Sequence, residues 1–179
     1  MKKLRLPEIG IVSACVKTPF GWLCYALSPK GLKECRFMFK TKKEAENILK
    51  AIFNDDDLLS DESVSDKWSE LFIKYFNGKL KKFDKIPLDT SSWTDFSKKV
   101  YGAVISIPYG RTASYGTVAS YLGNDKASRA VGNALKRNPV PPVVPCHRVI
   151  ASDKELCGFS ANGGLDLKLK ILEMERMNR

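Results

Sequence analysis

The sequence predicts a mixed α/β protein of the α+β type, with a small sheet and helices in residues 1–89 and a mainly helical part in residues 90–179. Three observations support this division. Strand-like runs open the chain, helix-spaced apolar stripes follow them, and a polar stretch over residues 79–89 separates the two parts. A chain of 179 residues can bury enough apolar surface to fold without disulfides or metal.

The first part begins with three runs rich in β-branched, aromatic and aliphatic side chains. These predicted strands cover residues 10–17, 22–27 and 32–39. The Ser-Pro-Lys-Gly sequence at residues 28–31 supplies turn chemistry between the last two, so we expect a small antiparallel sheet. Thr41 and Glu44 have the spacing of a capping box, which predicts a helix from there to about Phe53.

An aromatic stripe at helical spacing predicts a second helix that ends at Asn77 and Gly78. The stripe consists of Trp68, Leu71, Phe72, Tyr75 and Phe76. Aromatic side chains can also stack on nucleobases, but the spacing favours packing in a core. The acidic, serine-rich residues 54–66 before the helix are expected to form an exposed connection.

A helix over residues 93–106 opens the second part. Its predicted inward face comprises Phe96, Val100, Tyr101 and Val104. Pro108 and Gly110 end it, because each interrupts the helical hydrogen-bond ladder.

A helix-turn-helix is predicted next, with helices over residues 115–122 and 126–137. Ser114 can cap the first, Ala119 is small enough for close helix packing, and Gly123 relaxes the turn. The second helix combines small residues with the basic side chains of Lys126, Arg129, Lys136 and Arg137. This pattern fits a DNA-reading helix pair, and it also fits an ordinary helical hairpin.

The charge balance favours a polyanionic partner. The net charge is +10 and the pI is about 9.4. Such a charge is typical of a protein that binds nucleic acid or an anionic membrane surface, and it also occurs in basic proteins without such a partner.

No apolar run approaches the length of a membrane span, and the basic amino terminus lacks the apolar core of a signal peptide. We therefore expect a cytoplasmic protein without a membrane partner.

Cysteine usage argues against disulfides and metal. The five cysteines are odd in number and include no CxxC pair, and the chain holds a single histidine. A disulfide framework and a zinc site are therefore both unexpected.

The single histidine, His147, directly follows Cys146. A nucleophile beside the side chain that titrates near neutral pH suggests a reactive thiolate. The proline-rich residues 138–145 should form a stiff, non-helical strut that holds Cys146 in one orientation. Neighbouring side chains diverge, so we expect His147 to act through a water. A buried cysteine beside a hydrogen-bonded histidine is the structural alternative, and Cys157 is the rival nucleophile.

Over about residues 96–175 the sequence resembles the O6-alkylguanine-DNA alkyltransferases, because several separate motifs of that family occur in the same order. They are Ser114-Tyr115, Ser128-Arg129-Ala130-Val131-Gly132, Asn138-Pro139 and Pro145-Cys146-His147-Arg148-Val149. The resemblance implies an RNase H-like fold for the first part. It also implies repair of O6-alkylguanine in duplex DNA by irreversible transfer of the alkyl group to Cys146 in a single turnover, without a cofactor or metal.

The resemblance also implies roles for individual residues. His147 takes the thiol proton through water, Glu175 orients His147, and Asn138 ties the recognition helix to the active-site turn. Tyr115 turns the phosphate and hydrogen-bonds the base, and Arg129 replaces the extruded nucleotide. Further DNA contacts are expected at Ala127, Ser128 and Leu135, and further base-pocket residues at Val149, Ser160 and Lys168.

Two alternatives of other classes stay open at this stage. A lesion sensor or DNA-binding regulator would use the same helix pair without covalent change, although it has no need of Cys146. A Cys-His hydrolase would turn over steadily, although its histidine is normally remote in sequence. The sequence predicts a monomer and leaves open the accepted alkyl size and activity on O4-alkylthymine.

Overall fold

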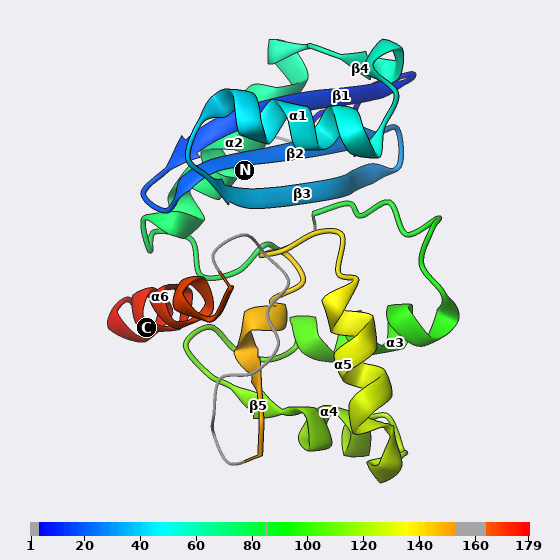
Figure 1. Cartoon of the computed structure of the whole chain (residues 1–179), viewed down its shortest axis with the longest axis vertical. Coiled ribbons are helices and arrows are strands. Elements are labelled where there is room, and N and C mark those ends of the chain that lie inside the picture. The colour runs from blue at the N-terminus through cyan, green and yellow to red at the C-terminus, as the bar shows by residue number, and fades with distance from the viewer. Residues whose placement is uncertain (1–3, 85, 153–163) are drawn as a thin grey trace. The chain divides into compact units, whose positions relative to one another are not determined.

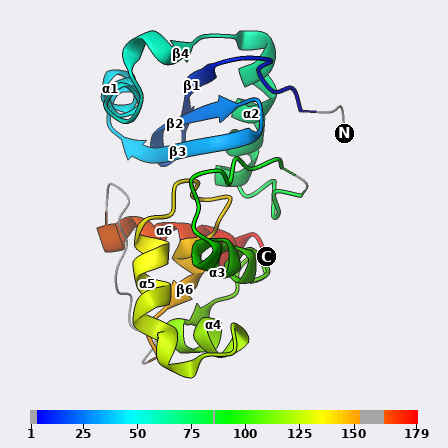
Figure 2. The same cartoon turned by 90° about the vertical axis from the view of Figure 1, so that its right-hand side faces the viewer.

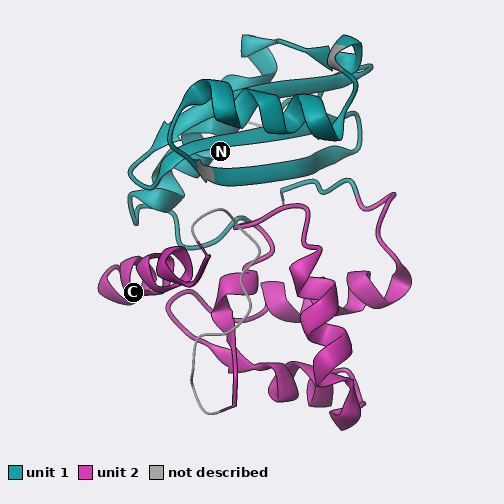
Figure 3. Ribbon diagram, in the orientation of Figure 1, with its two compact units in different colours: residues 1–89 teal, residues 90–179 magenta. Residues whose placement is uncertain are grey.

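The computed structural model describes residues 4–84, 86–152 and 164–179. The chain divides into two compact units, residues 1–89 and 90–179 (Figure 3). The predicted fold class, a small sheet with helices followed by a mainly helical part, is confirmed. Among the described residues, no helix combines the length and the apolar character needed to cross a membrane.

Unit 1 is built on a four-stranded sheet in the order β3-β2-β1-β4 (Figure 1). The strands are β1 (Ile11–Thr18), β2 (Gly21–Ser28), β3 (Gly31–Phe39) and β4 (Leu58–Leu59). The first three pair antiparallel, as the sequence predicts, and β4 pairs parallel to β1.

Two helices, α1 (Lys42–Ile52) and α2 (Glu62–Phe76), lie on either side of this sheet (Figure 2). The predicted capping box starts α1: Thr41 Oγ1 accepts from the Glu44 backbone, and Glu44 Oε2 accepts from the Thr41 backbone. The aromatic stripe of α2 packs in the core, with Trp68, Phe72, Tyr75 and Phe76 fully or almost fully buried.

The connection predicted over residues 54–66 is wrong in part. It contains a short 3-10 turn (Asp55–Asp57) and strand β4, and α2 begins at Glu62 with Asp61 as its cap. Two residues are too few to show strand alternation, so only pairing with β1 identifies β4.

Unit 2 begins with α3 (Asp95–Ile105), capped by Thr94. Val100, Tyr101 and Val104 are buried as predicted, but Phe96 is 40% exposed. Phe96 lies at the edge of the buried stripe, in the first turn, where Ser97 takes the inward position. The predicted inward orientation of Phe96 is therefore wrong.

The helix pair follows as α4 (Tyr115–Tyr121), a 3-10 turn (Asp125–Ala127) and α5 (Ser128–Lys136). A parallel two-stranded bridge joins β5 (Ala113–Ser114) to β6 (Val149–Ile150), and α6 (Gly164–Met177) ends the unit. Cys146–Arg148 form a 3-10 turn directly before β6.

Candidate active site

The proline-rich segment between α5 and Cys146 is non-helical, as predicted, and it is mostly buried. Asn138 organises it from within: its Nδ2 donates to the Val144 carbonyl at 2.8 Å, and its Oδ1 accepts from the Val140 backbone at 3.1 Å. The Cys146 backbone donates to the same Val144 carbonyl oxygen at 2.8 Å. Asn138, which follows the Arg137 cap of α5, thus fixes the turn that presents Cys146.

The bridge between β5 and β6 brings the helix pair to this turn. Ala113 pairs with Val149 and Ser114 with Ile150. Tyr115 follows β5 at once, and Cys146, His147 and Arg148 directly precede β6. Strand pairing therefore places the start of α4 beside the cysteine turn.

Cys146 is half-buried, whereas the groups behind it are fully enclosed. Burial raises the pKa of the Cys146 thiol, while a hydrogen bond with Asn138 and the charge of Lys168 lower it in part. Burial thus favours the neutral thiol at rest, so that a base is needed to form the predicted thiolate. Loss of hydration penalises the anion by more than Asn138 and Lys168 offset.

His147 is completely buried and pairs with Glu175 of α6. Its Nε2 lies 3.0 Å from Glu175 Oε1, so a neutral ring donates through Nε2 and keeps Nδ1 as its basic nitrogen. Burial lowers the pKa of His147, and the hydrogen bond to Glu175 opposes this effect. The ring is therefore neutral near pH 7 and able to accept a proton.

Arg148 completes the environment of Glu175. Its Nη2 donates to Oε1 at 2.8 Å, its Nε donates to Oε2 at 3.0 Å, and its Nη1 donates to the Ile107 carbonyl at 2.7 Å. Gly110 contributes a backbone hydrogen bond to Glu175 Oε2 at 3.0 Å. Burial alone would raise the pKa of Glu175, but the hydrogen bonds and charges of His147 and Arg148 hold it well below its usual range.

Sequence reasoning assigned no role to Arg148 or Gly110. The motif carried a signal for Arg148, because a buried carboxylate needs a cation and the pentapeptide contains one. The sequence predicts for Gly110 only that it ends the preceding helix. Its φ of +68° and the 3.1 Å that would separate an added Cβ from the Glu175 carbonyl oxygen both favour glycine there.

Lys168 and Val149 meet behind the turn. The Lys168 ammonium is fully buried and donates to the Val149 carbonyl at 2.7 Å. The contact holds β6 against α6 and places a positive charge near the thiol. Ser160, the third predicted pocket residue, and Cys157 lie outside the described residues.

The helix pair presents a basic surface through α5. Arg129 is exposed, Ser128 and Tyr115 are half-buried, and a Cβ at Gly132 would lie 3.7 Å from the Tyr115 ring.

Two of the predicted DNA-binding residues lie on the inner face of the pair: Leu135 and Ala127 are only 5% and 9% exposed. Their side chains therefore offer little surface to a duplex, and their predicted contact with DNA stays a prediction. The helix turns Val131, Ala134 and Leu135 inward, and the Tyr101 hydroxyl of α3 donates to the Ala134 carbonyl.

Within residues 4–84, 86–152 and 164–179, no cluster of three or more His, Cys, Asp or Glu side chains could hold a metal ion. The groups around Cys146 are instead arranged for proton transfer. They comprise a reachable thiol, a neutral imidazole and a buried carboxylate with a fixed cation.

Comparisons with known proteins match both units. The family described as 6-O-methylguanine DNA methyltransferase, DNA binding domain, matches residues 95–177. A methylated-DNA–protein-cysteine methyltransferase of Methanosarcina acetivorans is 40% identical over 162 residues, which cover 90% of this chain and 96% of that protein. One from Mycobacterium leprae is 47% identical over 102 residues, which cover 57% and 59% of the two chains. The crystal structure of Mycobacterium tuberculosis OGT in complex with DNA superposes with a TM-score of 0.76 at 32% identity, covering 93% and 94%.

Proposed function

The chain belongs to the methylated-DNA–protein-cysteine methyltransferase family, and we propose that it repairs O6-alkylguanine in DNA by transferring the alkyl group to its own Cys146. One observation carries the assignment to this residue. Cys146 is the described cysteine that combines partial exposure with an adjacent neutral histidine and a buried carboxylate. The DNA-bound relative supports DNA as the partner.

Transfer begins with deprotonation of a thiol that is neutral at rest. Because the pKa of Cys146 is raised, a base must remove its proton as the sulfur attacks. His147 Nδ1 takes this proton through a water, and Glu175 steadies the imidazolium that forms. Arg148 keeps Glu175 ionised throughout.

The sulfur then displaces guanine at the alkyl carbon. The S–C bond forms as the C–O6 bond breaks, and the electron pair leaves on guanine. The Tyr115 hydroxyl hydrogen-bonds the base as its negative charge develops. The product is a thioether that thiol exchange does not reverse, so each molecule acts once.

The target atom is shielded inside a stacked duplex, so the nucleotide must leave the stack. Arg129, exposed on α5, enters the gap while its charge stays near phosphates. Asn138, Val149 and Lys168 hold the turn and strand that line the pocket for the extruded base. The same displacement would remove an alkyl group from O4 of thymine, so we propose O4-alkylthymine as a second substrate.

The acceptor thiol also bears on where the protein works. A free cysteine nucleophile requires a reducing compartment, so the cytoplasm is the proposed site of action. Every residue that we assign to the site can come from one chain, and a monomer is therefore the proposed form.

The decisive experiment is a mass measurement after incubation with a duplex containing O6-methylguanine. The peptide bearing Cys146 should gain the mass of one CH₂ group, with at most one methyl per protein molecule. Cys146→Ser should abolish transfer and retain DNA binding, while Cys35→Ser, at a buried cysteine of unit 1, should retain both. Methylation of Cys157 with an unmodified Cys146 would refute the assignment, and lesion binding without any covalent change would identify a sensor.

A further inference from the structure

Two cysteines of unit 1 face each other across the sheet. Cys15 of β1 and Cys24 of β2 are direct partners in the antiparallel register. Opposed residues in such a ladder have Cα atoms about 4.5 or 5.5 Å apart, and both spacings fall in the range that a disulfide bridges. The sheet therefore already holds the two backbones at a distance suitable for a bond.

The two thiols also point the same way. Directly opposed residues share a face of the sheet, and Cys24 belongs to the apolar cluster under α1, against which Cys15 packs. The two side chains interact, since each thiol shifts the pKa of the other. Cys35 of β3 is different, because it is opposed to Tyr25 and so lies on the α2 face of the sheet.

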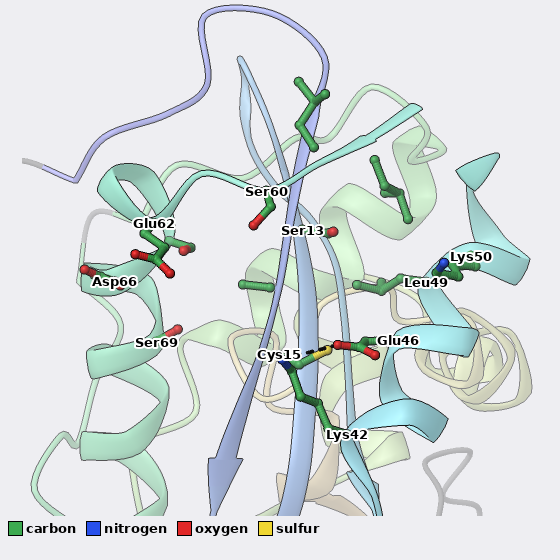
Figure 4. Close-up of a pocket in the computed structure, with 14 residues that line it drawn as sticks. Ser13, Cys15, Lys42, Glu46, Leu49, Lys50, Ser60, Glu62, Asp66 and Ser69 are labelled. Carbon is green, nitrogen blue, oxygen red and sulfur yellow. Dashed lines mark ion pairs between the residues drawn. The ribbon is translucent and has the colours of Figure 1, made fainter. Parts of the chain in front are cut away.

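Cys15 is reachable from solvent, whereas Cys24 is not. Cys15 is half-buried and lines a cavity of about 530 Å³ in unit 1, while Cys24 has no exposed surface. Figure 4 shows the Cys15 sulfur beside Lys42 and Glu46 of α1, which form an ion pair of 3.4 Å. The pair thus has an outer thiol open to a small reagent and an inner thiol shielded behind it.

The electrostatics favour the outer thiol as the nucleophile. The interaction with Cys24 lowers the pKa of Cys15 despite the opposing effects of burial and of the Glu46 charge, and Lys42 lowers it by a smaller amount. The interaction with Cys15 and burial raise the pKa of Cys24. One thiol is therefore poised to lose its proton first while its partner keeps its own.

We propose that Cys15 and Cys24 form a redox pair that a hydroperoxide oxidises to an intramolecular disulfide, with Cys15 as the attacking thiol. The Cys15 thiolate attacks one peroxide oxygen, the O–O bond breaks, and a sulfenic acid forms as hydroxide or alkoxide leaves and takes up a proton. Cys24 then attacks the Cys15 sulfur. The S–S bond forms, the S–O bond breaks, and hydroxide leaves with the Cys24 proton as water.

The electrons balance: the two thiols lose two electrons, which reduce the hydroperoxide to water and an alcohol, or to two waters when the reagent is hydrogen peroxide. Exchange with a small thiol reverses the bond, as suits a transient disulfide in a reducing compartment. The pair is separate from the proposed alkyl acceptor, Cys146, which belongs to unit 2.

The test uses the reduced full-length chain and one equivalent of hydrogen peroxide, followed by alkylation of the remaining thiols and digestion without reductant. Mass spectrometry should find the Cys15 and Cys24 peptides joined with the loss of two hydrogen atoms, and dithiothreitol should separate them. Cys15→Ser should slow oxidation of Cys24 by about tenfold or more, since the accessible thiol is gone. Cys24→Ser should leave a sulfenic acid on Cys15 that dimedone traps.

Cys35→Ser is the matched control, because it removes a buried thiol of the same sheet that lacks an opposed cysteine. Its yield of the Cys15–Cys24 disulfide should equal that of the wild type. The wild-type measurement needs no variant to fold, and it decides the proposal. An unmodified Cys15, or a Cys15 oxidised to sulfinic acid without linkage to Cys24, would overturn it. A methyl-transfer assay on the same samples reports separately on Cys146.

Discussion

At the scale of single residues, Glu175 is the group on which the site depends most. It accepts from His147, Arg148 and the Gly110 backbone, and it is fully buried. A carboxylate in this position orients the imidazole and neutralises the guanidinium at the same time. Its removal should therefore damage both the reaction and the fold.

Glu175→Gln should lower the single-turnover transfer rate by roughly a hundredfold, because the amide does not stabilise an imidazolium. It should also cost about 3–5 kcal/mol of stability, since Arg148 stays buried without a counter-charge. Rapid-quench transfer assays and urea unfolding measure the two effects. Glu173→Gln, at an exposed position of the same helix, is the control. Equal rates for the two variants would rule out the positioning role.

The pH dependence of transfer should report on His147. Its pKa is lowered by burial below the ordinary value of about 6.5, so the ring stays neutral as pH falls from 8 to about 6.5. Below that the ring gains a proton and the rate should fall. Glu175→Gln should move this acidic limb to lower pH, because the carboxylate raises the pKa of His147. An acidic limb that stays in place would point to a different titrating group.

Stability should fall over the same acidic range. The pKa values of Glu175 and His147 are both depressed in the folded state, so their contributions are complete above the unfolded values of about 4.3 and 6.5. As pH falls through each window, protons bind preferentially to the unfolded chain. Urea midpoints should begin to decline near pH 6.5 and decline further below about pH 4.3. A flat midpoint across both windows would contradict the buried pairing.

The residues that we propose for the chemistry could be predicted in part. Cys146 and His147 stood out because the chain has one histidine, and Glu175 followed from the family resemblance. The hydrogen bonds that Arg148 and Gly110 donate to Glu175 join positions far apart in sequence, so no local pattern reveals them. The raised pKa of Cys146 depends on burial, which a motif does not encode.

At the scale of elements, a helix cap fixes the start of the helix pair that we propose to face DNA. Ser114 Oγ accepts from the Thr117 backbone at 2.9 Å and starts α4, and Tyr115 is the first residue of that helix. Thr41 caps α1 in the same manner but lies in unit 1. Removing each cap in turn therefore separates the effect of a lost cap on stability from its effect on DNA binding.

Ser114→Ala and Thr41→Ala should each cost ~1 kcal/mol of stability, because each leaves a helical N–H without its side-chain acceptor. Only Ser114→Ala should also weaken binding to duplex DNA, because it loosens the turn that places Tyr115. Urea unfolding and fluorescence anisotropy with a labelled duplex measure the two quantities. Equal DNA affinities for the two variants would show that the α4 cap has no part in binding.

The exposed side chain of Arg129 on α5 gives a second test at this scale. Arg129→Ala should slow repair in duplex DNA by at least about tenfold, yet change repair in single strands much less, because no stacked gap needs filling there. Lys99→Ala removes an exposed positive charge from α3 and serves as the control. Equal losses on duplex and single strands would contradict the proposed entry into the duplex.

Long elements could be predicted from periodicity, whereas the two-residue strands could not. The three long strands and the helices have enough residues to show period 2 or 3.6, so their types were correct. β4, β5 and β6 exist only through their partners. The β5–β6 bridge is the contact that brings Tyr115 to the cysteine turn, so an important part of the site was invisible to pattern reasoning.

At the scale of the whole molecule, the net charge of +10 should govern the response of DNA binding to salt. Each phosphate that a lysine or arginine neutralises releases condensed counterions, which adds about −0.9 to the slope of log K against log salt. A lesion-free duplex and the Cys146→Ser variant isolate this binding from covalent capture. The affinity should fall steeply between about 50 and about 200 mM salt, by a factor that the number of phosphate contacts sets.

Individual charges can then be assigned by their effect on that slope. Arg137, exposed just after α5, should contact phosphate, so Arg137→Ala should reduce the slope by about one and weaken binding to all sequences alike. Lys43→Ala removes an exposed charge of α1 in unit 1 and should leave the slope unchanged, because the proposed DNA surface belongs to α4 and α5. Titrations at several salt concentrations give the slopes directly. If both variants reduce the slope equally, the charge of the whole chain, and not the helix pair alone, holds the duplex.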